Sequence, residues 1–133
     1  MIIEIPVAIA ELFDKISILE IKLRQIKDPI RLAHVERELD QLMGIVRQHQ
    51  LTDFVEDDLY RQLRHTNQVL WDVCELRRHY EEIGQFDDAF IEKSRLEYKT
   101  NDQRARLKQQ INQRFDSTIV EIKSYKQFNQ SAD

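Results

Sequence analysis

Glycine and proline are so scarce in this chain of 133 residues that most fold classes are excluded at once. There are two of each, Gly44, Gly84, Pro6 and Pro29, whereas they make up about 12% of an average sequence. Sandwiches, propellers and up-and-down barrels need frequent tight turns, and phosphate-binding loops need closely spaced glycines. We therefore predict an all-α fold, an antiparallel bundle of about four helices.

The first half of the chain is predicted to be a helical hairpin. Residues 2–5 are rich in isoleucine and precede a proline, so a short extended segment is expected there. A first helix is expected from about residue 8 to 27. Its apolar residues lie on two faces, as in a helix at the centre of a bundle or at a dimer interface. Asp28 and Pro29 are typical of a helix start and begin a second helix that reaches about residue 50.

Two longer helices are expected in the second half. Thr52 or Asp53 is the predicted cap of a third helix, which ends at Gly84. A fourth helix is expected to begin near Asp87, and its apolar row extends to Ile122. These long segments, each with one solvated face, account for the high content of charged residues without any functional explanation.

We expect one helical domain over residues 1–126 and a polar tail over 127–133. Gly44, inside the second helix, is the expected place for a close helix approach or a break. Cys74 falls in the apolar row of the third helix and is expected in the core. Because it is the only cysteine, an intramolecular disulfide is excluded.

The net charge of −4 is unevenly distributed. Residues 34–92 carry fourteen acidic and six basic side chains, whereas residues 93–126 carry four acidic and nine basic ones. Either a basic last helix packs beside acidic neighbours, or this helix binds anions. An isoelectric point near 5.6 disfavours general nucleic-acid binding. No apolar run is long enough to span a membrane and the start lacks a signal peptide's basic region, so the cytoplasm is the expected compartment.

Charged residues on apolar stripes are candidates for a buried polar site. On a helical wheel, Glu20 lies between Phe13 and Ile16 in the first helix, and Arg104 lies on the apolar stripe of the fourth. A buried charge is costly unless it is paired, so we predict that Glu20 meets a cation, with Arg104 or Lys108 as the first choice. The candidate set, all placed on inner faces, is Glu20, Asn67, Arg77, Glu81, Arg104 and Lys108.

This candidate set has two interpretations. It is either an internal ion-pair network that fixes the register of the helices, or a polar pocket for a small anionic ligand clamped by Arg77, Arg104 and Lys108. No metal site or cofactor is expected, because no histidine follows an acidic residue at the spacing used in di-iron bundles. The segment from Asp28 through Arg31 resembles the inter-helix segment of helical chorismate mutases, which bind a dicarboxylate.

Three stretches of the chain resemble the signatures of a bacterial family of domains of unknown function. They are EIPVAIAELFDKISILEIK from Glu4 to Lys22, TNDQRARLKQQIN from Thr100 to Asn112, and EIKSY from Glu121 to Tyr125. The resemblance implies no activity, only a context of cell-surface polysaccharide and glycosyltransferase genes. The resemblance implies that Trp71 is the tryptophan of the family's Leu-Trp pair. It also implies that the family's polar motif positions are Lys15, Glu20, Lys22, Asn101, Asp102, Arg104, Lys108 and Lys123. The stretch after Trp71 matches less well.

We therefore expect a small helical interaction or ligand-binding module in a cell-surface polysaccharide context. A homodimer is expected through the two-faced first helix and the apolar N-terminal segment, and the other partner is a second protein or a small anionic ligand. The alternative is an enzyme acting on an anionic metabolite or sugar phosphate, with Glu20 or Glu81 as acid or base. A concave pocket that gathers the three cations would favour the enzyme, and a tightly packed interior would favour a scaffold.

Overall fold

The computed structural model describes residues 1–116, 124 and 126–128. Its helices are α1 (Ile9–Gln25), α2 (Pro29–Gln48), the short 3₁₀ helix η1 (Thr52–Glu56), α3 (Asp58–Ile83) and α4 (Asp88–Arg114). No strand occurs in this described part, so the predicted all-α class is confirmed. None of the described helices is long and apolar enough to cross a membrane. Ile122, which we placed in the fourth helix, lies outside the described residues.

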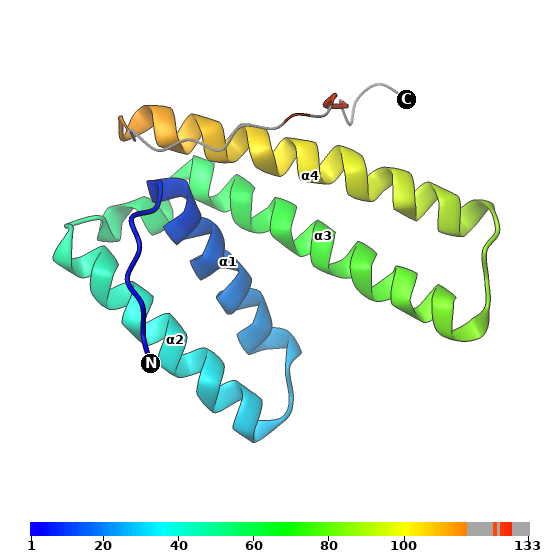
Figure 1. The fold of residues 1–133 in the computed structure, drawn as a ribbon, viewed down its shortest axis with the longest axis horizontal. Helices are drawn as coiled ribbons and strands as arrows, with labels where there is room; N and C mark the ends of the chain where they lie inside the picture. The colour runs from blue at the N-terminus through cyan, green and yellow to red at the C-terminus, as the bar shows by residue number, and fades with distance from the viewer. Residues whose placement is uncertain (117–123, 125, 129–133) are drawn as a thin grey trace.

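The four long helices form two antiparallel hairpins, α1–α2 and α3–α4, which meet near η1 and diverge toward their loops (Figure 1). α1 is the central helix, because it packs against α2 as well as against α3 and α4. Ile16 and Ile21, on its two apolar faces, are fully buried within the chain, whereas Ile18 of the second face is only half-buried. Of the two positions predicted for this helix, the centre of the bundle is the one observed.

The core lies at the closed end, where the two hairpins meet. Phe54 of η1 packs edge to face against Phe13 of α1, with ring centroids 4.6 Å apart, and against Phe115, 5.1 Å away. Tyr60 of α3 completes the cluster at 5.8 Å from Phe13. Edge-to-face aromatic pairs add stabilisation beyond the area they bury. This aromatic cluster joins both hairpins and η1 at one point.

Capping residues define most helix ends as predicted. Asp28 accepts a hydrogen bond from the Ile30 amide at 3.2 Å, so it caps α2. Asp87 caps α4 by accepting from the amides of Ala89 and Phe90. Gly84 ends α3 in the left-handed conformation, with φ of +67°, which only glycine adopts without strain.

The start of the third helix differs from the prediction. Thr52 and Asp53 begin η1, and α3 is capped instead by Asp57, which accepts from the Leu59 amide at 2.9 Å. The reason is the burial of Phe54, whose ring needs a tight turn of its own to reach the aromatic cluster. A pattern of caps alone gives no sign of that tertiary contact.

Gly44 marks neither a break nor a close helix approach, so that expectation is wrong. α2 runs unbroken from Pro29 to Gln48. A Cβ added at Gly44 would meet only the end of the Arg47 side chain, at 3.9 Å. The glycine therefore weakens α2 without relieving any steric conflict.

Candidate functional site

A buried carboxylate, Asp14 of α1, joins three helices at the closed end. Its side chain is only 6% exposed. Oδ1 accepts hydrogen bonds from Nε of Arg104 at 3.0 Å and from Nδ2 of Asn67 at 2.9 Å, and Oδ2 accepts from Nη2 of Arg104 at 2.5 Å. The arginine is bidentate, which is the strongest geometry for a guanidinium and a carboxylate. α1, α3 and α4 are thus tied together at one residue.

Further polar side chains surround this carboxylate. Asn67 also donates to the Ser17 hydroxyl at 2.7 Å, and Ser17 donates to the Asp14 carbonyl at 2.8 Å. Lys108 of α4 pairs with Glu11 at 2.8 Å and lies 3.9 Å from Asp14. We call this set, whose members come from α1, α3 and α4, the polar hub: Asp14, Ser17, Asn67, Arg104 and Lys108.

The polar hub keeps Asp14 ionised despite its burial. Burial raises the pKa of this carboxyl, but the hydrogen bond and charge of Arg104, the hydrogen bond of Asn67 and the charge of Lys108 together lower the pKa below its ordinary value. The hydrogen bonds and opposite charges of these partners offset the cost of removing the carboxylate from water. Three members of the candidate set, Asn67, Arg104 and Lys108, thus meet at Asp14, a residue outside that set.

The predicted pairing of Glu20 with Arg104 or Lys108 is wrong. Glu20 instead accepts a hydrogen bond from the Tyr60 hydroxyl at 2.7 Å and lies 3.5 Å from Nη1 of Arg64. Burial raises the pKa of Tyr60, and its hydrogen bond to Glu20 raises the pKa further, so the phenol stays protonated and donates. Glu20 therefore meets a cation as expected, although the cation comes from α3.

Two other candidates lie along α3, away from the polar hub. Arg77 pairs with Glu97 of α4, and its guanidinium lies 5.5 Å from the ring centroid of Phe90. It fastens the two helices of the second hairpin together. Glu81 is exposed, so its predicted place on the inner face is wrong.

The motif positions are spread over several surfaces. Lys15 is exposed and pairs with Glu38 of α2 at 2.7 Å, which joins the first hairpin on its outer side. Lys22 is half-buried near the end of α1. Lys123 lies outside the described residues. Lys15 and Lys22 are not part of the polar hub.

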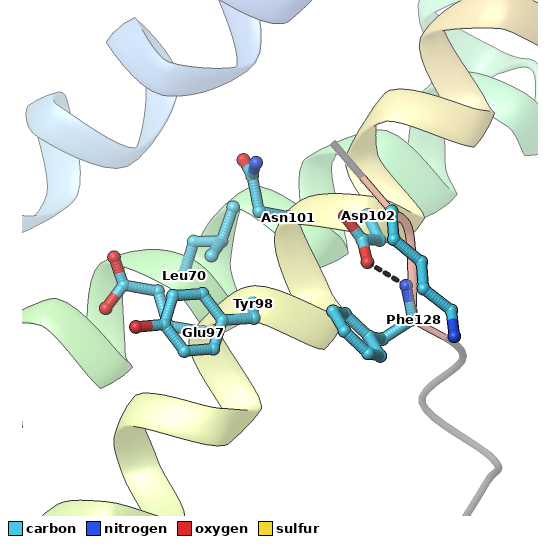
Figure 2. Close-up of a pocket in the computed structure, with 7 residues that line it drawn as sticks. Leu70, Glu97, Tyr98, Asn101, Asp102 and Phe128 are labelled. Atoms are coloured by element: carbon cyan, nitrogen blue, oxygen red, sulfur yellow. Dashed lines mark hydrogen bonds between the residues drawn. The ribbon is translucent and has the colours of Figure 1, made fainter. Parts of the chain in front are cut away.

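Asn101 and Asp102 of α4 face different ways, as Figure 2 shows. Asp102 is buried and accepts a hydrogen bond from the Phe128 amide. A small hollow of about 180 Å³ lies there, and Asn101 and Tyr98 are among the residues that line it. Asn101 also accepts from Nη1 of Arg104 at 3.4 Å, which connects it to the polar hub.

An open cleft of about 450 Å³ lies between α1 and the α3–α4 hairpin, next to the polar hub. We call it the interhairpin cleft. Its apolar lining consists of Ile18, Ile21, Leu70, Trp71 and Cys74, and its polar lining consists of Asn67, Glu75, Arg78, Glu97, Asn101 and Arg104. Cys74 is half-buried in this wall, so the expectation that it lies in the core is wrong.

The cleft gathers few of the groups expected of an anion site. Of the three predicted cations, only Arg104 lines it, because Arg77 is paired with Glu97 and Lys108 is paired with Glu11. Within the described residues, no group of three or more His, Cys, Asp or Glu side chains is placed to hold a metal ion. The arrangement offers an apolar surface with a polar border rather than a cluster of converging catalytic groups.

Comparison with known sequences finds a family of unknown function. Residues 1–132 match a family of unknown function, DUF6165. No curated protein and no solved structure matches the chain. The family match extends over all four helices and both the polar hub and the interhairpin cleft, so these features lie within the family's domain. The chain belongs to DUF6165, a family of unknown function.

Proposed function

We propose that this protein is an interaction module that binds an amphipathic helix of a partner protein in the interhairpin cleft. The observation that carries the proposal is the open cleft itself, whose apolar lining consists of aliphatic side chains, a tryptophan and a thiol. Amphipathic helices bind to proteins by placing their apolar row in a groove of this kind. The module would then hold two hairpins at a fixed angle around its partner.

The shape of the cleft favours a helix over a small molecule. One wall is the α1 row of Ile18 and Ile21, and the facing wall is the α3 row of Leu70, Trp71 and Cys74. Each wall belongs to a long helix, and the space between the two walls is open rather than enclosed. A third helix that packs between two others covers both rows at once.

Polar residues at the border supply specificity. Glu75 and Arg78 of α3 are exposed at the edge of the cleft, and Glu97 stands on α4. Charges of both signs around an apolar floor orient a bound helix and reject helices with the wrong charge pattern. Trp71 is the kind of large, half-buried side chain that contributes most at protein interfaces.

The alternative function, an enzyme acting on an anionic metabolite or sugar phosphate, has less support. It requires Arg77, Arg104 and Lys108 to converge on one ligand, whereas each of them is engaged elsewhere and only Arg104 lines the cleft. Neither Glu20, which is bound by Tyr60 and Arg64, nor the exposed Glu81 lines the cleft.

The proposal keeps the expected bacterial cytoplasm and the context of cell-surface polysaccharide and glycosyltransferase genes that the family resemblance implies. The partner helix is then to be sought in a protein of that process. Sugar phosphates and nucleotide sugars, which are the anionic metabolites of the same process, are the natural competitors to test beside it.

The cleft contains its own reporters. Trp71 is the only tryptophan and Cys74 the only cysteine of the chain, and both line the cleft. A library of amphipathic helical peptides is to be screened for members that bind the protein. Each peptide that binds is then titrated into the protein. We expect binders to shift Trp71 fluorescence to shorter wavelength and to slow alkylation of Cys74.

Two variants show whether binding occurs in the cleft. Ile18→Glu places a charge in the apolar lining of the cleft and is expected to abolish binding. Ile45→Glu is the matched control, because Ile45 of α2 is 40% exposed and does not line the cleft. This control variant should bind as the wild type does. Helices that bind both variants equally would contradict the proposal. A response to sugar phosphates combined with no response to any helix would also contradict it and would favour the enzyme.

A further inference from the structure

The loops at the open ends of the two hairpins carry opposite charges. Residues 22–31, around the α1–α2 loop, contain four basic side chains and one acidic one. Residues 81–92, around the α3–α4 loop, contain five acidic side chains and no basic one. We call these segments the basic tip and the acidic tip. Their charged side chains are mostly exposed.

Each tip also exposes apolar side chains among its charges. Ile30 of the basic tip is 72% exposed, and Ile83, Phe86 and Ile91 of the acidic tip are each more than half exposed. Phe86 packs edge to face on Phe90, with ring centroids 5.4 Å apart, so the acidic tip has a preformed aromatic surface. Apolar patches with a charged border are typical of protein–protein contact surfaces.

The two tips of one copy are held apart. Figure 1 shows both loops on the open side of the molecule, with the hairpins diverging toward them. The angle between the hairpins is set at the closed end, where Asp14 binds Arg104 and Asn67 and where Phe54 packs against Phe13. These contacts join α1 to the second hairpin well away from the tips. The basic tip and the acidic tip of the same copy therefore cannot come into contact unless the polar hub breaks.

We infer that the tips bind those of a second copy of this chain, so that the protein forms a two-fold symmetric dimer with the two interhairpin clefts facing each other. A two-fold axis in front of the cleft brings the basic tip of one copy to the acidic tip of the other, and the same contact then forms a second time. The charges of unlike tips attract, whereas like tips would repel in a parallel arrangement.

This dimer replaces one of the two grounds on which a homodimer was expected from the sequence. The second apolar face of α1, which carries Ile18 and Ile21, lines the interhairpin cleft and is not an outer surface of the molecule. The N-terminal segment stays exposed, with Ile2 and Ile3 each more than 70% accessible, but it carries no charge pattern that selects a partner. The tips combine complementary charge with apolar area, and charge complementarity sets orientation and speeds association.

Sedimentation of the full chain tests the inference. At micromolar concentrations and low salt we expect a species of twice the 16.0 kDa mass of the chain. Raising the salt from about 0.1 M to 1 M shortens the screening length from ~10 to ~3 Å, so the dimer should weaken as salt rises. A monomer at every concentration and salt would overturn the inference.

Charge reversal identifies the surfaces. Lys27→Glu with Arg31→Glu makes the basic tip acidic, and the triple change Glu81→Lys, Glu82→Lys and Glu92→Lys makes the acidic tip basic. All five residues are exposed, so both variants should fold, as circular dichroism will verify. Each alone has two tips of the same sign, and we expect its dissociation constant to rise by about tenfold or more.

Mixing the two charge-reversal variants is the decisive step. Every contact in the mixed pair joins unlike charges again, so a heterodimer should form from two chains that are each monomeric. Glu36→Lys with Asp40→Lys, on the exposed side of α2, is the matched control and should leave the wild-type dimer intact. A dimer that survives both reversals, or that is lost only when residues 2–7 are deleted, would overturn the inference.

The inference is independent of the proposed function. The tips lie outside the lining of the interhairpin cleft, so peptide binding reported by Trp71 and Cys74 should persist in the monomeric variants. Loss of the dimer with unchanged peptide binding would refute neither proposal. A stable dimer in which no helix protects Cys74 would uphold the tips and contradict the cleft function.

Discussion

Asp14 connects three helices through one carboxylate, and this makes it the residue whose loss is expected to cost most. Its two oxygens are shared among Arg104, Asn67 and, at longer range, Lys108. Removing one member of a buried charged pair costs about 3–5 kcal/mol, because the partner is left uncompensated. The polar hub therefore fixes α1 against α3 and α4 next to the interhairpin cleft.

A double-mutant cycle tests this pairing. Asp14→Asn and Arg104→Met are each expected to lower the free energy of unfolding by about 3 kcal/mol, and their effects should be non-additive by about 1 kcal/mol or more. Urea unfolding of the two single variants and the double variant gives the coupling. The control cycle combines Glu20→Gln with Arg104→Met, which share no partner and should be additive within about 0.5 kcal/mol. Coupling in the control cycle alone would contradict the structure.

Asp14 also predicts how stability depends on pH. Its pKa in the folded state lies below the ordinary value of 3.8, so the unfolded chain binds the proton more readily. The stability that the carboxylate contributes is complete above the ordinary pKa and is lost as pH falls through the folded-state pKa. We expect urea unfolding of wild type to show a free energy that declines below about pH 4, with a shallower decline in Asp14→Asn. An equal change in slope for Asp40→Asn, an exposed control, would contradict this assignment.

Sequence patterns identified the need for a buried ion pair but not its members. Glu20 stood out because it interrupts a strong apolar seam on α1. On a helical wheel, Asp14 lies between Ile18 and Ile21 on the second apolar face, and Ser17 lies beside Ile21. That face was recognised without its polar members. A helical wheel read for both faces would have found Asp14. Its choice of Arg104 depends on how α4 lies across α1, which no local pattern contains.

At the scale of single helices, α2 contains a removable weakness. Gly44→Ala adds a Cβ whose nearest neighbour is the end of the Arg47 side chain at 3.9 Å, so it should stabilise the protein by about 0.5–1 kcal/mol. Gly84→Ala, with φ of +67°, should instead destabilise it by about 1 kcal/mol. Thermal unfolding of the two variants gives the signs, and stabilisation by both would contradict the helix assignments.

The start of α1 depends on a side chain from the other end of the domain. Ala8 occupies the cap position but has no side-chain acceptor, and Asn112 of α4 accepts from the Ala10 amide at 2.9 Å instead. Asn112→Ala should therefore lower the free energy of unfolding by about 1–3 kcal/mol, the cost of a buried amide left unpaired. Measured by urea unfolding, Ala8→Ser should restore part of this loss by supplying a local cap. No rescue would contradict this account of the helix start.

Most helix boundaries could be predicted because their signals are local. Asp28 and Asp87 cap amides two or three residues ahead of them with their side chains, and Gly84 acts through its own backbone. Each was identified from one or two residues of sequence. The beginning of α3 was missed because Phe54 is held by rings far away in the chain. Asn112 was missed for the same reason, since its partner on α1 is 102 residues away.

At the scale of the whole molecule, the angle between the hairpins has no local signature. The scarcity of glycine and proline predicts long helices, and the apolar rows predict that they pack. Leu70, Trp71 and Cys74 form such a row, but only the placement of α1 decides that they line a cleft instead of a closed core. Cys74 was assigned to the core for this reason. The cleft and the two tips both follow from this divergence.

The reaction of Cys74 with an alkylating reagent tests most directly whether the interhairpin cleft is open in the native protein. We predict that Cys74 reacts without unfolding, so the rate should be unchanged by the stabilising variant Gly44→Ala. If Cys74 were accessible only by global unfolding, a stabilisation of about 0.5–1 kcal/mol would slow the reaction roughly two- to fivefold, since 1.4 kcal/mol corresponds to a factor of ten. An unchanged rate supports the open cleft, and a rate that falls with stability contradicts it.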